Sequence, residues 1–188
     1  NGQEWQRLGS DSKLVRGLMD WGLAEIRAGC KTSGRRLLRA AVDEASRHPD
    51  GVLGGGGIQA LHRWASEERK NGNKNQAKSL INEGVETDPY NPYLWLLKGK
   101  MFSDAGQTHA ARSCFENGLK MNPRFLGILN EWAKMEMSVG DIRTARTIFN
   151  DMIGINPDDV KTLQSWAVAE ARIGDPERAR LLFQRAIS

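Results

Sequence analysis

The chain has 188 residues, of which 27 are lysine or arginine and 23 are aspartate or glutamate, so its net charge is +4. That length allows one or two domains with a sizeable core, and the mild positive charge permits an acidic or nucleic-acid partner without requiring one. The two cysteines, Cys30 and Cys114, lie far apart and fit a reducing interior better than a secreted disulfide scaffold. No apolar run approaches the roughly 18 residues of a membrane span.

The first part of the chain is expected to form a helix pair of its own. Residues 1–10 are mostly polar and are expected to be an N-terminal extension. Residues 11–50 are expected to form a first repeat, with one helix over about 11–29 and its partner over about 32–47. Four apolar residues of the first helix fall on one stripe that is predicted to face the core. They are Leu14, Leu18, Trp21 and Ile26.

Residues 51–57 read GVLGGGG and interrupt the pattern that the rest of the chain follows. A glycine run can cradle a phosphate, but that use requires a preceding strand and a following Gly-Lys-Ser/Thr, and the sequence has neither. We therefore interpret 51–57 as a glycine-rich insertion that connects the first repeat to the others.

From residue 58 onward the sequence repeats itself every 34 residues, a period typical of a solenoid of helix-turn-helix units. The clearest markers are four glycines, each expected to end a first helix: Gly72, Gly106, Gly140 and Gly174. A proline follows the first three of them by 17 residues, where the second helix must stop. Residues 58–188 are expected to form four helix pairs: 58–71 with 74–87, 92–105 with 108–121, 125–139 with 142–155, and 159–173 with 176–187. The predicted fold is all-α, an α-α superhelix of about five repeats.

Equivalent positions of the repeats carry the same kinds of side chain. In four of the five repeats a tryptophan stands eight residues before the helix-ending glycine, and a glutamate stands four before it. The tryptophans are Trp21, Trp64, Trp132 and Trp166. The glutamates are Glu25, Glu68, Glu136 and Glu170. Small residues directly after the tryptophans let helices approach closely, so we interpret the aromatic stripe as core rather than as a base-stacking platform.

A basic residue stands six residues after each helix-ending glycine, on the second helix. This basic column comprises Arg35, Lys78, Arg112, Arg146 and Arg180. We interpret the column as structural, pairing with the recurring glutamate of the same or the next repeat. The middle repeat has Phe102 in place of that glutamate and still keeps Arg112, which argues against pairing within one repeat.

The unit W-A-x-x-E-x-x-x-G-x-x-x-x-A-R-x-x-F resembles the half-a-TPR (HAT) repeat, a variant of the tetratricopeptide repeat found mainly in RNA-processing proteins. The stretches WAKMEMSVGDIRTARTIF and WAVAEARIGDPERARLLF carry it most fully. The middle unit instead resembles an ordinary tetratricopeptide repeat through Trp95, Gly99, Phe102, Ala111, Phe115 and Pro123. In the type of its repeats the chain is similar to HAT-repeat factors of plastids, and this resemblance implies binding and protection of organellar transcripts.

A helical solenoid presents its first helices along a concave face, and the inward positions of those helices are mainly basic. They hold eight positive side chains and one acid, Asp104. Such a stripe is expected of a groove that follows phosphates, and an inward tyrosine can stack a base. The residues predicted to bind RNA are Arg16, Arg27, Arg69, Lys70, Tyr93, Lys100, Asn130, Lys134, Lys161, Gln164 and Arg172. The plain alternative is a solvated polar face that happens to be basic.

These patterns favour a non-catalytic scaffold that binds single-stranded RNA in organellar RNA processing or transcript stabilisation. The chloroplast is favoured, with the mitochondrion or nucleus as alternatives. The competing hypothesis is an assembly subunit that grips other polypeptides and does not contact RNA. The three histidines are scattered, and no metal-ligand spacing, Walker loop or nucleophile motif is present, so we expect no enzyme activity, metal, cofactor or small-molecule substrate. The sequence stops inside a second helix, so further repeats or a protein partner are expected to cover that end.

Overall fold

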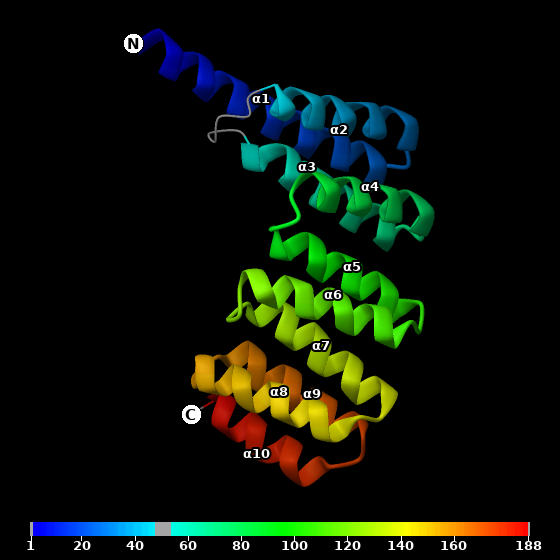
Figure 1. Ribbon diagram of the computed structural model, residues 1–188, viewed down its shortest axis with the longest axis vertical. Coiled ribbons are helices and arrows are strands. Elements are labelled where there is room, and N and C mark those ends of the chain that lie inside the picture. Colours follow the sequence, from blue (N-terminus) through cyan, green and yellow to red (C-terminus); the bar gives the residue numbers. More distant parts are fainter. Residues whose placement is uncertain (1, 48–53, 188) are drawn as a thin grey trace. The chain divides into compact units, whose positions relative to one another are not determined.

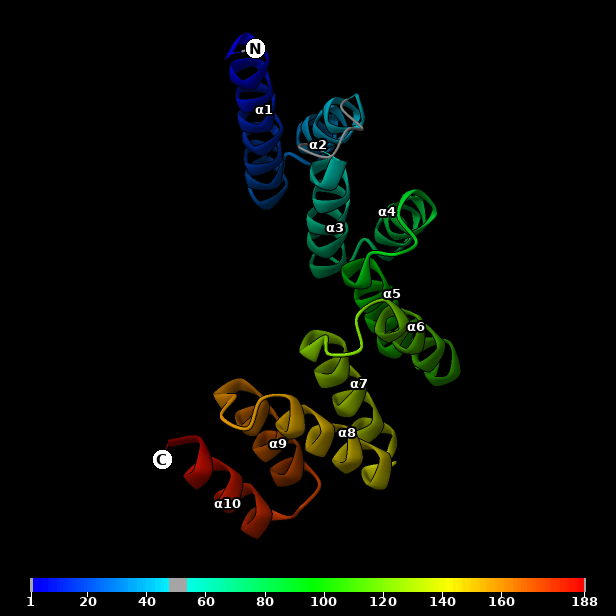
Figure 2. The same ribbon diagram turned by 60° about the vertical axis from the view of Figure 1, so that its left-hand side comes forward.

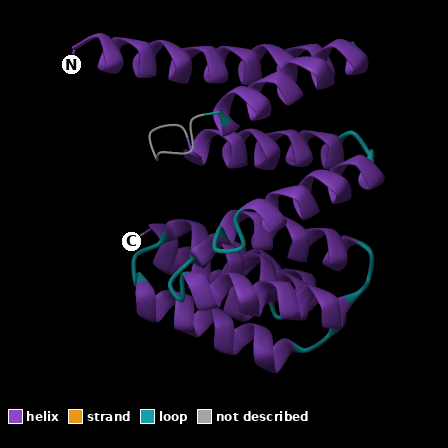
Figure 3. Ribbon diagram, turned by 45° about the horizontal axis from the view of Figure 1, so that its top comes forward, coloured by secondary structure: helices purple, strands orange, loops and turns teal. Residues whose placement is uncertain are grey.

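The computed structural model describes residues 2–47 and 54–187, which form ten α-helices joined by short turns. Figure 3 shows this all-helical architecture, without a strand in the described ranges. In chain order the helices are α1 (Gly2–Arg27), α2 (Lys31–Ser46), α3 (Gly54–Lys70), α4 (Lys74–Thr87), α5 (Pro92–Asp104), α6 (Thr108–Met121), α7 (Leu126–Val139), α8 (Ile142–Ile155), α9 (Val160–Arg172) and α10 (Pro176–Ile187). The predicted helical-repeat fold is confirmed.

The helices fall into two compact units, Asn1–Pro89 with α1 to α4 and Tyr90–Ser188 with α5 to α10. Within each unit the two helices of a repeat pack on one another in opposite directions (Figure 1). The first helices of successive repeats lie side by side, α1 with α3 in the first unit, and α5 with α7 and α7 with α9 in the second (Figure 2). The division follows the second repeat, whereas the sequence indicates a break after the first.

The first helix is longer than the sequence predicts. Residues 1–10 were expected to lie outside the repeats as an extension, but α1 begins at Gly2 and continues without interruption to Arg27. The expectation rested on the mostly polar composition of these residues. Glutamine, glutamate, arginine and leucine are good helix formers, so a mostly polar segment can continue a helix.

The glycine-rich insertion is partly helical rather than a loop. The helix α3 begins at Gly54, so the last four residues of 51–57 form its first turn, while 51–53 lie outside the described residues. Glycine is a poor helix former. However, Gly57 is buried against α2, where an added Cβ would stand 3.4 Å from the Cβ of Ala45. Packing against α2 therefore overrides the local preference.

The helix-ending glycines have the left-handed backbone that the 34-residue period predicts. At Gly140 φ is +88°, and the N–H of the next residue, Asp141, donates to the carbonyl of Glu136. Residues with a Cβ rarely adopt this conformation, which is why glycine recurs there. The following helix starts at once, because the Asp141 side chain accepts a hydrogen bond from the N–H of Thr144. The repeat period is thus set by one kind of turn.

Stacked aromatic pairs join successive repeats in the second unit. The ring of Phe149 on α8 stacks on that of Trp166 on α9, with centroids 5.4 Å apart. Phe115 on α6 stacks in the same way on Trp132 of α7 at 6.2 Å. Both phenylalanines are fully buried, Trp64 and Trp166 nearly so, and Trp132 is half-buried, which confirms the aromatic stripe as core for these three tryptophans.

The equivalent side chains of the first and last helices are exposed. Trp21 and Leu14, both predicted to face the core, are 59% and 49% exposed. Phe183 of α10 occupies the same repeat position as Phe149 and is 41% exposed. Among the described helices, none covers α1 or α10 in the way that neighbouring repeats cover the inner ones. Burial at these positions is therefore decided by the adjacent repeat.

Candidate functional site

Each buried glutamate of a first helix is held by an arginine from the preceding repeat. Glu170 of α9 accepts two hydrogen bonds from Arg146 of α8, at 2.8 and 2.7 Å, and a third from Trp166 Nε1 at 2.7 Å. The same arrangement joins Glu136 to Arg112 and Trp132, and Glu68 to Arg35 and Trp64. The structural interpretation of the basic column is thus confirmed for three arginines, and their pairs connect successive repeats.

These hydrogen bonds keep Glu68 and Glu170 charged inside the protein. Burial alone would raise the pKa of Glu170, but the bonds from Arg146 and Trp166 outweigh it and hold the pKa below its usual value. The pKa of Glu68 is lowered for the same reasons, with Asn73 as a further donor. A carboxylate whose lone pairs are occupied by fixed donors is suited to joining helices.

Two members of the basic column lack such a partner among the described residues. Lys78 is exposed on α4. Arg180 on α10 pairs with Glu177 of its own helix at 2.6 Å, and both side chains are largely exposed. The column is therefore structural only where a following repeat supplies the glutamate.

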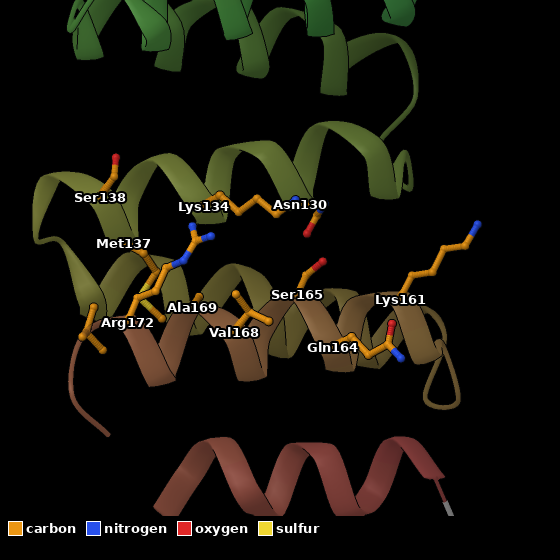
Figure 4. A pocket seen from close by; sticks show the side chains of 11 residues that line it. Asn130, Lys134, Met137, Ser138, Lys161, Gln164, Ser165, Val168, Ala169 and Arg172 are labelled. Atoms are coloured by element: carbon orange, nitrogen blue, oxygen red, sulfur yellow. The ribbon is translucent and has the colours of Figure 1, made fainter. Parts of the chain in front are cut away.

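A groove between α7 and α9 brings together five of the residues predicted to bind RNA. They are Asn130, Lys134, Lys161, Gln164 and Arg172. The groove has a volume of about 620 Å³ and lies wholly within the second unit. Figure 4 shows Arg172 reaching from α9 toward α7, and Lys161 pointing outward from α9 away from Arg172. The five residues share one groove because the first helices α7 and α9 pack side by side.

The cations of the groove are accessible. Lys161 and Arg172 are exposed and have no acidic partner among the described residues. Lys134 is exposed as well, and its Nζ lies 3.4 Å from an oxygen of Glu131. Of the described residues that line the groove, none is aspartate or glutamate. The groove is therefore positively charged, although Glu131 lies at its edge beside Lys134.

The floor of the groove combines apolar and amide groups. Met137 of α7, Val168 and Ala169 of α9, and Ile173 directly after α9 supply the apolar surface. Asn130 contributes a buried Oδ1 that has no hydrogen-bond partner among the described residues. An unsatisfied buried oxygen is costly unless a ligand or water supplies a donor. The groove can thus accept an anionic group at its rim and a hydrogen-bond donor at Asn130.

In the first unit the predicted basic residues Arg27 and Lys70 lie beside one acidic side chain. Arg27 of α1 donates two hydrogen bonds to Glu67 of α3, at 3.1 and 3.0 Å. Lys70 lies 3.9 Å from the same carboxylate. Arg16 is exposed on α1, and Arg69 is half-buried on α3. The structure therefore does not gather these four residues into one basic site.

Two predicted residues of the second unit also have partners. Lys100 of α5 is half-buried and its Nζ lies 2.6 Å from Glu131 of α7. Burial alone would raise the pKa of Glu131, but the bonds and charges of Lys100 and Lys134 lower it. Tyr93 is 53% exposed and meets the ring of Phe125 edge-on, with centroids 4.7 Å apart. Tyr93 is thus accessible, but it does not line the groove.

Sequence reasoning missed the two acids that matter most here, Glu67 and Glu131. They were left out because only selected inward positions were counted, although neighbouring positions face the same surface. The spacings Glu67 to Lys70 and Glu131 to Lys134 are readable in the sequence, since residues three apart on a helix are neighbours. The contacts from α1 to α3 and from α5 to α7 depend on tertiary packing and had no local signal.

Other site types find no support in the described part of the chain. No group of histidine, cysteine or acidic residues there is arranged to hold a metal ion. None of its helices is both long and apolar enough to cross a lipid bilayer.

The tetratricopeptide repeat family matches residues 92–125. This is the middle unit, α5 and α6 with the turn that follows, and its resemblance to an ordinary tetratricopeptide repeat is confirmed. The chain is thus a tetratricopeptide-like helical-repeat scaffold, a class typical of protein–protein interaction.

A curated relative shares part of the sequence. The chain is 36% identical over 84 residues to the PsbD mRNA maturation factor Nac2, a chloroplast protein of Chlamydomonas reinhardtii. The match covers 45% of this chain and 6% of that protein, so the chain spans a small fraction of the relative's length.

Solved structures show the same fold at low sequence identity. A thermophilic tetratricopeptide repeat protein of Thermus thermophilus superposes with a TM-score of 0.69 at 15% identity, covering 92% of this chain and 90% of that one. PilF of Pseudomonas aeruginosa gives 0.68 at 12% identity, covering 95% and 77%. A tetratricopeptide repeat protein of Parabacteroides merdae gives 0.65 at 16% identity, covering 93% and 66%. These likenesses establish the fold alone.

Proposed function

We propose that the chain is a non-catalytic scaffold that holds single-stranded RNA by its phosphates in the groove between α7 and α9. The observation that carries this proposal is the set of Lys134, Lys161 and Arg172 along one groove whose described lining contains no carboxylate. Three cations that line one groove attract phosphates, and phosphate contacts supply a large share of the affinity of many nucleic-acid binding proteins.

Two further observations support RNA as the ligand. The Oδ1 of Asn130 needs a donor, and the ribose 2′-hydroxyl or a base amino group can provide one. The Chlamydomonas relative is a chloroplast mRNA maturation factor. We accordingly place the proposed activity in organellar RNA processing or transcript stabilisation, where occupancy of the transcript blocks nucleases or recruits other factors.

A second candidate function is protein binding without RNA. It is favoured by the apolar floor of the same groove, where Val168 is 41% exposed, and by the absence of an aromatic side chain from its described lining. Base stacking on aromatic side chains is the usual supplement to phosphate contacts in single-strand binders. A polypeptide with an acidic flank and an apolar centre would satisfy both parts of the groove.

The test is a fluorescence-anisotropy titration of a labelled single-stranded RNA of about 20 nucleotides at several salt concentrations. We expect low-micromolar affinity that falls linearly on a log–log plot against salt. Replacing Lys134, Lys161 and Arg172 together with alanine is expected to weaken binding about 10-fold or more and to reduce the salt slope by about 2, because each single-strand phosphate contact contributes about 0.7.

The matched control replaces Lys120, Arg124 and Arg143 with alanine. These residues are also exposed in the second unit, lie outside the groove lining, and change the net charge by the same amount. Equal losses of RNA affinity in both variants would show that binding depends on the net charge of the protein and not on the groove. Absence of binding at low salt would reject RNA and leave the protein-binding candidate.

A further inference from the structure

An ion pair closes the space between the neighbouring first helices α5 and α7. The Nζ of Lys100 on α5 lies 2.6 Å from a carboxylate oxygen of Glu131 on α7, and the two side chains are 27% and 25% exposed. Lys100 stands six residues before its helix-ending glycine, and Glu131 stands nine before the next one. These two repeat positions therefore meet across successive first helices.

The next pair of first helices, α7 and α9, has the same lysine without the acid. Lys134 stands at the repeat position of Lys100, and the half-buried Ser165 stands at that of Glu131. Both line the groove, and Figure 4 shows the Ser165 hydroxyl directed from α9 toward α7. Because serine carries no charge, α9 supplies no counter-ion at this position. Lys134 is 44% exposed and lies 3.4 Å from Glu131 of its own helix, and an exposed pair of this kind contributes little.

A second difference between the two pairs of helices also favours a ligand at the later one. Leu96 of α5 packs against an apolar core, whereas the same repeat position of α7 holds Asn130. The Oδ1 of Asn130 is buried and has no hydrogen-bond partner among the described residues. Such an amide costs stability unless a ligand or water supplies a donor, and a leucine would not. The groove between α7 and α9 is therefore polar where the preceding contact is apolar.

We propose that Ser165 makes this groove an anion-binding site. An anion of the ligand takes the place that the Glu131 carboxylate has one repeat earlier, and it binds the ammonium of Lys134 and the hydroxyl of Ser165. The pair of Lys100 with Glu131 is thus a counterpart, within the chain, of the contact that the ligand makes. This inference rests on the proposed function, under which the anion is one phosphate of the RNA.

The first test needs no RNA. Ser165→Glu should place a carboxylate opposite Lys134, as Glu131 stands opposite Lys100, and raise the melting temperature by about 2 °C. In a chain that also carries Lys134→Ala, the same substitution should give no such rise because its partner is gone. Asn150→Glu is the control of equal charge, at an exposed position of α8 outside the groove lining. Equal shifts from Ser165→Glu in both backgrounds would overturn the proposed position of the anion.

The second test is the RNA titration described above. Ser165→Glu should raise the dissociation constant about 10-fold and lower the salt slope by about 0.7, the contribution of one single-strand phosphate. Ser165→Gln has nearly the same shape without the charge, so we expect its dissociation constant to stay within about 3-fold of the parent value. Equal losses of affinity for the two variants would overturn the proposal, because size alone would then explain them.

The converse substitution, Glu131→Ser, should open the space between α5 and α7 to a second phosphate. It removes the carboxylate that pairs with Lys100, so we expect the dissociation constant to fall about 5-fold and the salt slope to increase by about 0.7. Glu116→Ser makes the same change of net charge at an exposed position of α6 and is the control. An affinity for RNA that rises equally in both variants would contradict the equivalence of the two pairs of helices.

The two tests separate this inference from the proposed function. If Ser165→Glu is coupled to Lys134 in a chain that binds no RNA at low salt, RNA is rejected and the anion position is kept, with an acidic polypeptide as its ligand. If RNA binds and Ser165→Glu does not weaken it, the proposed function is kept and the anion position is overturned.

Discussion

Trp166 and Trp21 occupy the same position of the same sequence motif, each with a glutamate four residues later, but their surroundings differ. Trp166 is 5% exposed, stacks on Phe149, and shares Glu170 with Arg146 from the preceding helix. Trp21 donates to Glu25 in the same way but is 59% exposed. The motif therefore prepares one half of a contact, and the neighbouring repeat determines whether that contact stabilises the protein.

The largest expected difference is between alanine substitutions of the two tryptophans. Trp166→Ala should lower the free energy of unfolding by about 3–5 kcal/mol, because it opens a cavity in the packed junction. Trp21→Ala should change it by about 0.5 kcal/mol or less, since an exposed side chain leaves no cavity. Urea denaturation of dilute protein measures both. Similar losses of unfolding free energy in the two variants would contradict the conclusion that the neighbouring repeat determines whether the tryptophan is buried.

Buried and exposed members of the basic column should differ in the same way, with smaller changes in the free energy of unfolding. Arg146→Ala removes two hydrogen bonds from the buried Glu170 and should cost about 2 kcal/mol, because Glu170 then keeps the indole donor and the more distant Arg178. Arg180→Ala removes an exposed pair and should cost about 0.5 kcal/mol or less. Thermal unfolding of both variants at equal concentration tests this. A cost for Arg180→Ala as large as that for Arg146→Ala would be incompatible with an exposed pair.

Acid should weaken the buried junctions selectively. The folded protein holds the pKa of Glu170 below the ordinary value of 4.5, so the unfolded chain binds this proton first as the pH falls. The stabilisation is therefore complete above about pH 5 and is lost as the pH falls through the folded pKa. Chemical denaturation between about pH 6 and 3 should show a shallower decline for Glu170→Gln than for the parent. The exposed Glu86→Gln variant is the control and should decline like the parent.

Much of the fold could be predicted because its information is local and repeated. A glycine with φ near +88° ends a first helix and Asp141 starts the next, so a short stretch of sequence defines the turn. Stacking repeats of equal length makes equivalent residues meet, which is why the tryptophan and glutamate columns predicted core positions correctly for the inner repeats. The errors came where no described repeat stands alongside, at Leu14 and Trp21, or where helix packing overrode composition, at Gly57.

The candidate site was predictable only in part. The repeat positions of Asn130, Lys134, Lys161, Gln164 and Arg172 were readable in the sequence, and the packing of α7 beside α9 places them on one groove. The sequence did not reveal that Arg27 and Lys100 are held by Glu67 and Glu131, because these partners are 40 and 31 residues away. Whether a cation is available depends on its neighbours in space.

The sequence by itself determined the all-helical repeat fold, its turns and the register of its columns, because propensity, capping and period act over a few neighbouring residues. The tertiary structure alone decided which members of each column are buried, which arginine reaches which glutamate, and which lysines remain accessible. Side-chain burial and ion pairing depend on the helices that pack alongside, and this packing is the reason that Trp166 is buried whereas Trp21 is exposed.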